Sequence, residues 1–97
     1  MEEGKLWLRC IKHNRIARDL VVPCQESAWE EALREGCHAL DVSVPVLLPR
    51  HLKDWAEFKQ MRFAPGDFMD AVAFDRMEAE YFEDGHPRGE NRDPRNA

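Results

Sequence analysis

The sequence predicts an α+β fold. A small, mainly antiparallel sheet of about four strands follows the order β-β-α-β-(α)-β, and one main amphipathic helix packs on the sheet. Two observations predict it. Short segments rich in β-branched and aromatic residues are bounded by turn residues, and one longer segment repeats its apolar residues with the period of a helix. Since both faces of the first two strands are partly apolar, the sheet could also curl toward a partial barrel.

The first two strands are predicted at residues 5–11 (KLWLRCI) and 16–22 (IARDLVV), joined by a two-residue turn at His13-Asn14. Asparagine tolerates the positive φ that such a tight hairpin turn requires. In this register Arg9 and Arg18 face each other, which is unfavourable unless an acid lies close to both. The register also predicts that one face of the hairpin carries Trp7, Ile11, Ile16 and Leu20, and the other Leu6, Leu8, Cys10, Ala17 and Val21.

The main helix is predicted at residues 27–40, in the segment SAWEEALREGCHALD. Ser27 is followed three residues later by Glu30, which is the pattern of a capping box at a helix start. Apolar or small residues then recur at helical spacing, with charged residues mainly off that stripe. The stripe that we expect to pack against the sheet consists of Trp29, Ala32, Leu33, Gly36, Cys37 and Leu40.

The segment that follows is predicted to be a strand at residues 42–49 (VSVPVLLP). Because Pro45 has no backbone N–H, this strand belongs at a sheet edge or beside a bulge. Residues 50–60 (RHLKDWAEFKQ) read as a shorter helix. Its expected buried side consists of Leu52, Trp55 and Ala56.

The last strand is predicted at residues 71–82, after a turn at residues 64–67 (APGD). The apolar alternation changes phase at Asp75-Arg76, which predicts a β-bulge there. Residues 5–84 should form a single α+β domain. Residues 85–97 (GHPRGENRDPRNA) have almost nothing to bury and should be a disordered tail that can be deleted without loss of stability.

The order of the segments KLWLRCIKHNRIARDLVV, HALDV, VPVLLP, KQMRF and VAFDRMEAEYFED resembles that of a group of short, functionally uncharacterised bacterial proteins. The resemblance spans roughly residues 5–84 and implies one compact α+β domain. None of these segments is a catalytic signature, so no residue role is carried over from the group.

The composition indicates a globular domain of the cytoplasm. Hydrophobic residues make up 43% and charged residues 34% of the 97 residues. Three cysteines form no recognisable disulfide framework, which favours a reducing compartment. The acidic start MEEGKLWL lacks the apolar segment of a signal peptide, and no stretch approaches the ~18 apolar residues of a membrane span. We therefore expect no membrane partner.

Residue types that bind metal or act as nucleophiles are present without a supporting signature. Structural zinc sites bring ligands in close pairs, and Cys10 with His13 is the only such pair among Cys10, His13, Cys24, Cys37 and His38. The expected alternative is that the thiols are small core residues, although Cys24 follows a proline and could be exposed. The sequence thus predicts no metal and no cofactor. The missing catalytic motifs argue against an enzyme without deciding the question.

Glu78 and Glu80 are the closest approach to a paired-carboxylate site. On a strand they would share one face at about 6.5–7 Å. Such a spacing occurs in glycosidases. A solvated strand face predicts the same spacing, and a small domain offers no deep cleft, so we favour the solvated face.

Charge is unevenly distributed in this acidic chain, whose net charge is −5. Residues 5–18 contain five lysines and arginines and no acid, whereas residues 67–84 contain seven acids and one arginine. Opposite charges on neighbouring strands stabilise a sheet. We therefore predict that the last strand pairs with the first and brings Glu78 or Glu80 near Arg9.

The sequence carries no signature that decides the function. The leading hypothesis is a small non-catalytic interaction or regulatory protein that binds another protein or forms a homodimer, because the apolar hairpin faces need a cover. The alternative is a nucleic-acid-binding module that uses the basic hairpin. Both place the interaction surface at Arg9, Lys12, His13, Arg15 and Arg18.

Overall fold

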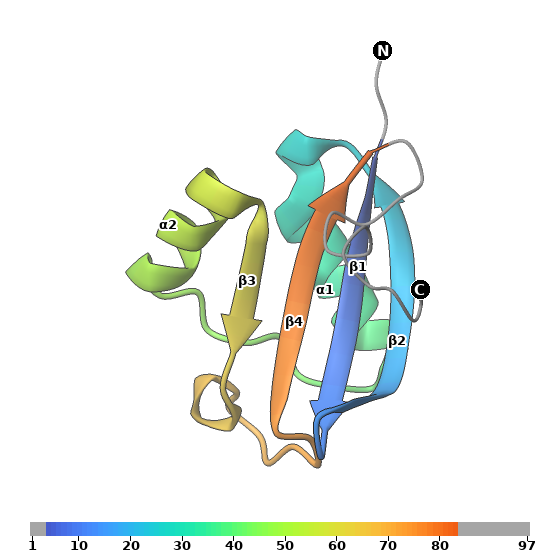
Figure 1. Cartoon of the computed structure of the whole chain (residues 1–97), viewed down its shortest axis with the longest axis vertical. Coiled ribbons are helices and arrows are strands. Elements are labelled where there is room, and N and C mark those ends of the chain that lie inside the picture. Colours follow the sequence, from blue (N-terminus) through green and yellow to red (C-terminus); the bar gives the residue numbers. More distant parts are fainter. Residues whose placement is uncertain (1–3, 84–97) are drawn as a thin grey trace.

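The computed structural model describes residues 4–83 and shows an open four-stranded antiparallel sheet with two helices (Figure 1). The sheet order is β2-β1-β4-β3, so the first and last strands lie side by side in its centre. This confirms the α+β class, while the sheet does not close into a barrel. The elements are β1 (Gly4–Lys12), β2 (Arg15–Cys24), α1 (Trp29–Ala39), α2 (Pro49–Phe58), β3 (Gln60–Phe63) and β4 (Arg76–Phe82).

The β1–β2 hairpin turns at His13-Asn14 as predicted, and both residues have positive φ (56° and 64°). Its register differs from the predicted one beyond the first two pairs. A bulge leaves Ala17 unpaired, because Ile11 pairs with Ile16 but Cys10 pairs with Arg18. The predicted facing of Arg9 and Arg18 is therefore wrong.

The bulge also exchanges the two faces of the rest of β2. Leu20 lies opposite Leu8, on the side of the sheet that α1 covers, and Val21 lies opposite Trp7 on the other side. Both had been predicted on the opposite faces. A one-residue shift in register moves every later side chain to the other face, so a single unpaired residue explains both errors.

The apolar stripe of α1 is confirmed, because Ala32, Leu33, Gly36, Cys37 and Leu40 are all buried and Trp29 is half-buried. A Cβ atom added at Gly36 would clash with Cδ1 of Leu8, so glycine allows α1 to approach the sheet closely. The predicted Ser27 cap is wrong. Ser27 lies in a 3₁₀ turn (Glu26–Ala28), and α1 begins after it without a side-chain cap.

The segment after α1 differs most from the prediction. Residues 42–48 have no regular secondary structure, so the predicted strand is absent. The sheet instead contains β3, an edge strand that was not predicted. The observed order is therefore β-β-α-α-β-β. Pro45 removes one backbone donor from this segment, and Pro49 is the first residue of α2. One of the remaining amides, that of Val46, donates to the carbonyl of Asp67 at 2.8 Å rather than to a sheet neighbour.

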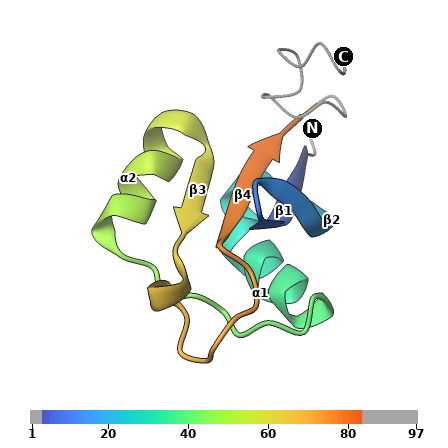
Figure 2. The ribbon, with the colours of Figure 1, turned by 60° about the horizontal axis from the view of Figure 1, so that its bottom comes forward.

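Helix α2 was predicted correctly as a helix but with the wrong buried side. Trp55 is buried as expected, whereas Leu52 is 47% exposed and Ala56 is exposed. His51 takes the second inward position. The Trp55 ring packs on Trp29 of α1, with the ring centroids 4.8 Å apart, so the two helices meet through their tryptophans. Helix α1 lies against one face of the sheet, over β1 and β2, and α2 lies beside β3 at the edge of the sheet (Figure 2).

The last strand starts at Arg76 rather than at residue 71, and the predicted bulge at Asp75-Arg76 is instead the beginning of the strand. The turn predicted at residues 64–67 is present as a 3₁₀ turn (Pro65–Asp67). The predicted tail, residues 85–97, lies outside the described residues. Between residues 4 and 83, neither helix has the length and apolar character needed to cross a membrane.

Candidate interaction surface

The sheet face that α1 leaves open carries a charge network centred on Arg9. Strand β4 pairs with β1 as predicted, with Glu78 opposite Arg9 and Glu80 opposite Trp7. The Arg9 guanidinium forms ion pairs with Glu78 at 3.0 Å and with Glu80 at 3.2 Å, and it lies 4.2 Å from the centre of the Trp7 ring. The prediction that an acid of the last strand neutralises Arg9 is thus confirmed.

The carboxylate of Glu78 also pairs with a second arginine, since Nε of Arg76 donates a hydrogen bond to it at 2.8 Å. Burial raises the pKa of Glu78, but the Arg76 hydrogen bond and the Arg9 and Arg76 charges outweigh burial and hold the pKa below its ordinary value. Glu78 and Glu80 do share a face. Both carboxylates turn to Arg9, which is the arrangement of structural charge pairing rather than of an acid–base pair.

The other four residues of the predicted interaction surface lie at the hairpin end and are exposed. They are Lys12, His13, Arg15 and Arg18. The backbone N–H of His13 donates to Asp75 at 2.9 Å, which ties the turn to the segment before β4. Within residues 4–83, none of these four side chains forms an ion pair shorter than 4.0 Å. Arg9 is therefore part of the charge network, and the exposed cationic cluster at the hairpin end consists of Lys12, Arg15 and Arg18.

The free edge of β2 is the longest strand edge of the described residues. Strand β2 has ten residues and pairs only with β1. The carbonyl of Ile11 accepts from the backbone N–H of Asp75, so the backbone groups of Ile11 point toward β4. Backbone groups alternate in direction along a strand, so those of Arg9 and Trp7 also point toward β4. Their partners in β2, Asp19 and Val21, therefore direct their amides away from β1. Ile16 and Val21 are 48% and 43% exposed. Unpaired backbone donors and apolar side chains therefore lie together on this edge.

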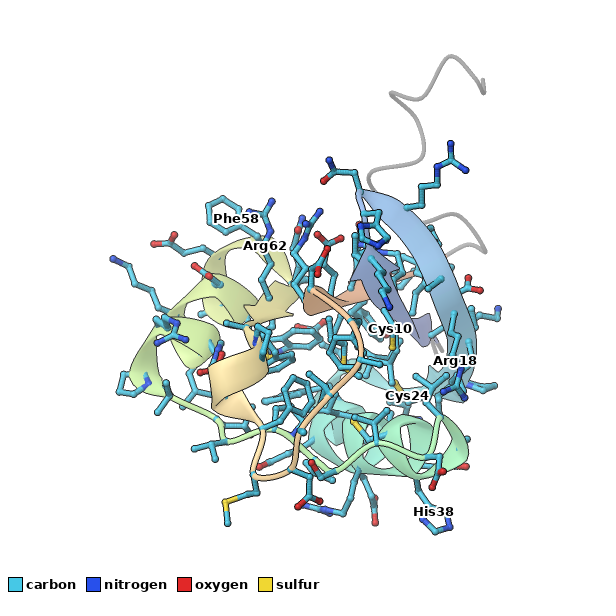
Figure 3. The ribbon with its side chains drawn as sticks, turned by 90° about the horizontal axis from the view of Figure 1, so that it is seen from below. Cys10, Arg18, Cys24, His38, Phe58 and Arg62 are labelled. Atoms are coloured by element: carbon cyan, nitrogen blue, oxygen red, sulfur yellow. The ribbon has the colours of Figure 1, made fainter. Side chains whose placement is uncertain are left out.

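A groove lies between the end of β2 and α1, beside this edge. It encloses about 570 Å³. Figure 3 shows Cys24 on β2 and His38 on α1, which mark two ends of the groove wall. The sequence carries no signal for this groove, because Ala28 precedes α1 and Ala32 belongs to the apolar stripe that packs on the sheet. The lining residues are Pro23, Cys24, Ala28, Glu31, Ala32, Arg34, Glu35 and His38.

A buried polar network joins α2 to the turn after β3. Nδ1 of His51 accepts from the backbone N–H of Leu48 at 2.9 Å, so the neutral ring carries its hydrogen on Nε2. That atom lies 3.3 Å from Oδ2 of Asp67, outside hydrogen-bond geometry. Asp67 accepts from Arg50 and from the backbone N–H of Ala64, each at 2.9 Å. The network closes the loop between α2 and η2 (Pro65–Asp67).

Replacing Asp67 with alanine should lower the free energy of unfolding by about 1–3 kcal/mol, because the Ala64 amide loses its acceptor. Burial raises the pKa of Asp67, but the Ala64 hydrogen bond and the Arg50 guanidinium outweigh it and lower the pKa. A lowered folded-state pKa contributes stability above the unfolded pKa, and that contribution is lost as pH falls through the folded pKa. Urea unfolding at several pH values should show the two proteins converging in acid. Asp70→Ala, an exposed acid of the same loop, is the control; an equal loss for both variants would contradict the assignment.

Two of the three thiols are core residues, as expected. Cys10 and Cys37 are buried, and burial raises the pKa of both, that of Cys37 to about 11. They are therefore protonated near neutral pH and are not activated nucleophiles. Cys24 is half-buried at the β2 groove. Within the described part of the chain, no three His, Cys, Asp or Glu side chains are grouped so as to hold a metal ion.

The geometry gathers the sequence-predicted residues into two places: Arg9 in the charge network, and the four others at the hairpin end beside the free β2 edge. The resemblance to uncharacterised bacterial proteins stays a prediction. No protein-family model, curated protein or solved structure matches the chain.

Proposed function

We propose that this protein is a non-catalytic binding protein of the cytoplasm that accepts an extended segment of another protein along the free edge of β2. The observation that carries the proposal is the ten-residue edge strand with outward amides at Asp19 and Val21. An extended peptide that adds to a sheet edge gains main-chain hydrogen bonds there.

The groove beside the edge supports this mode of binding. In strand addition, pockets for alternate side chains give the specificity that main-chain bonds lack. Here small residues, Ala28 and Ala32, face a rim with charges of both signs, Glu31 and Arg34 among them. The arrangement suits a ligand that places one apolar side chain in the groove and polar side chains on its rim.

The test is selection of peptides from a displayed random library on the purified protein, followed by binding measurements on two variants. Val21→Pro removes the outward N–H of the edge, and Val21→Ala keeps it while removing the side chain. We expect selected peptides to bind wild type and Val21→Ala alike, and Val21→Pro at least about tenfold more weakly, since each 1.4 kcal/mol is a factor of ten. Thermal unfolding of each variant verifies the fold. Peptides that bind Val21→Pro equally well, or a selection that enriches none, would refute the proposal.

A homodimer is the related form of this proposal, in which the extended segment is β2 of a second copy. The exposed Ile16 and Val21 favour it, because two-fold pairing of edge strands covers apolar residues of both copies. Sedimentation equilibrium distinguishes the two forms. A dimer that Val21→Pro dissociates indicates self-pairing, and a monomer at high micromolar concentration indicates a different partner.

Nucleic-acid binding is the second candidate, favoured by the cationic cluster of Lys12, Arg15 and Arg18. The loss of Arg9 to the charge network reduces the cluster, and the acidic net charge of the chain opposes it. Fluorescence anisotropy with short RNA and DNA at two salt concentrations tests it, because phosphate contacts weaken steeply as salt rises. Binding that Arg15→Gln weakens at low salt would move this function to first place.

A further inference from the structure

A second cavity lies at the hairpin end, on the helix-covered side of the sheet. It encloses about 370 Å³, which is within the range of small-molecule pockets. Its walls come from three separate parts of the chain: the β1–β2 hairpin, the residues after α1, and the segment before β4. In Figure 3 the molecule is seen from this end, with Cys10 between the sheet and α1 and Arg18 on β2. Apolar walls are given by Ala17, Val42, Ala71, Val72, Ala73 and Phe74.

The charges around this pocket are divided by element. The hairpin contributes two cations, Lys12 and Arg18, and the two loops contribute two acids, Asp41 and Asp70. Among residues 4–83, none of the four forms an ion pair shorter than 4.0 Å. An apolar cavity therefore has separate cationic and anionic sides that do not neutralise each other.

A buried polar atom in the lining adds a third kind of contact. Ser43 belongs to the pocket wall, and its Oγ is buried without a hydrogen-bond partner among the described residues. Buried hydroxyl groups in proteins are nearly always hydrogen-bonded. The Ser43 Oγ is closed to solvent, so it reaches a ligand only if the pocket wall shifts; a hydroxyl can then donate to a carboxylate or accept from an ammonium group.

We propose that this pocket binds a small zwitterion with an apolar body, of the chemical class of an α-amino acid with an apolar side chain. Its carboxylate faces Lys12 and Arg18, its ammonium group faces Asp41 and Asp70, and its side chain packs on Val72 and Phe74. A ligand with a single charge would pair with only one side of the pocket and leave the two like charges of the other side without a counter-charge. The pocket and the β2 groove share no lining residue, so this proposal does not depend on the proposed function.

The test is titration of the ¹⁵N-labelled protein with L-phenylalanine and L-leucine, observed by amide chemical shifts. Two analogues lack one charge each: N-acetyl-L-phenylalanine has no ammonium group, and phenethylamine has no carboxylate. We expect saturable shifts at residues 41–43 and 70–74 with an amino acid, and affinity at least about tenfold lower for both analogues, which corresponds to 1.4 kcal/mol.

Variants assign the two sides of the pocket. Arg18→Gln should weaken amino-acid binding while leaving phenethylamine unchanged, and Asp70→Asn should weaken it while leaving N-acetyl-L-phenylalanine unchanged. Lys53→Gln, an exposed cation of α2 outside the lining of either groove, is the control and should bind as wild type does. All three positions are exposed, and thermal unfolding checks that each variant folds. No saturable shift at about 10 mM amino acid, or analogues that bind as well as the amino acids, would overturn the proposal.

Discussion

Replacing Leu33 with alanine should lower the free energy of unfolding by about 2–5 kcal/mol, the range of buried leucine truncations. Leu33 is fully buried in the layer between α1 and the sheet. The truncation removes apolar contacts and leaves a cavity that the small core cannot collapse completely. Urea unfolding followed by tryptophan fluorescence measures the change. Glu30→Ala, on the exposed side of the same helix, should change the midpoint little, and an unchanged midpoint for Leu33→Ala would mean that another helix face packs on the sheet.

Replacing Arg9 with methionine should lower the free energy of unfolding by about 3 kcal/mol at neutral pH. The variant leaves the buried carboxylates of Glu78 and Glu80 without the guanidinium that compensates their charge. The side chains of Arg9 and Glu80 are only 13% and 3% exposed. Methionine keeps the apolar stem over Trp7 and removes the charge. Arg34→Met, an exposed arginine of α1, is the control for the loss of a surface cation.

The cost of Arg9→Met should depend on pH. The lowered pKa of Glu78 means that its pairing contributes stability above the ordinary glutamate pKa and loses that contribution as pH falls through the folded value. The difference in unfolding free energy between wild type and variant should therefore narrow below pH ~4. Urea midpoints that are equal at neutral pH, or a difference that stays constant in acid, would contradict a stabilising role for the network.

Local signals predicted the first half of the fold well. The His13-Asn14 turn depends on the two residues that adopt positive φ, and the α1 stripe depends on the spacing of its own residues. The bulge at Ala17 has no comparable local signal. It moves Asp19 opposite Arg9 and removes the facing of Arg9 with Arg18, so it is a property of two paired strands rather than of one segment.

The second half was predicted less well because its strands depend on distant partners. Residues 42–48 are as apolar as a strand, but Pro45 removes one of their backbone donors. The four residues of β3 gain strand structure from pairing with β4. Charge complementarity did predict that β4 pairs with β1. The groove at β2 and the pocket at the hairpin end could not be predicted, since each is assembled from segments whose contact requires the finished sheet.

The sheet order has a consequence for how the chain folds. The central strands β1 and β4 come from opposite ends of the described residues, with β2, both helices and β3 between them. The β1–β2 hairpin can form early because its contacts are local, whereas closing the loop that joins β1 to β4 carries the largest entropic cost. Until β4 arrives, β1 has an open edge and β3 has no strand to pair with. A polypeptide interrupted before Arg76 is therefore expected to expose an aggregation-prone edge rather than to form a smaller stable unit.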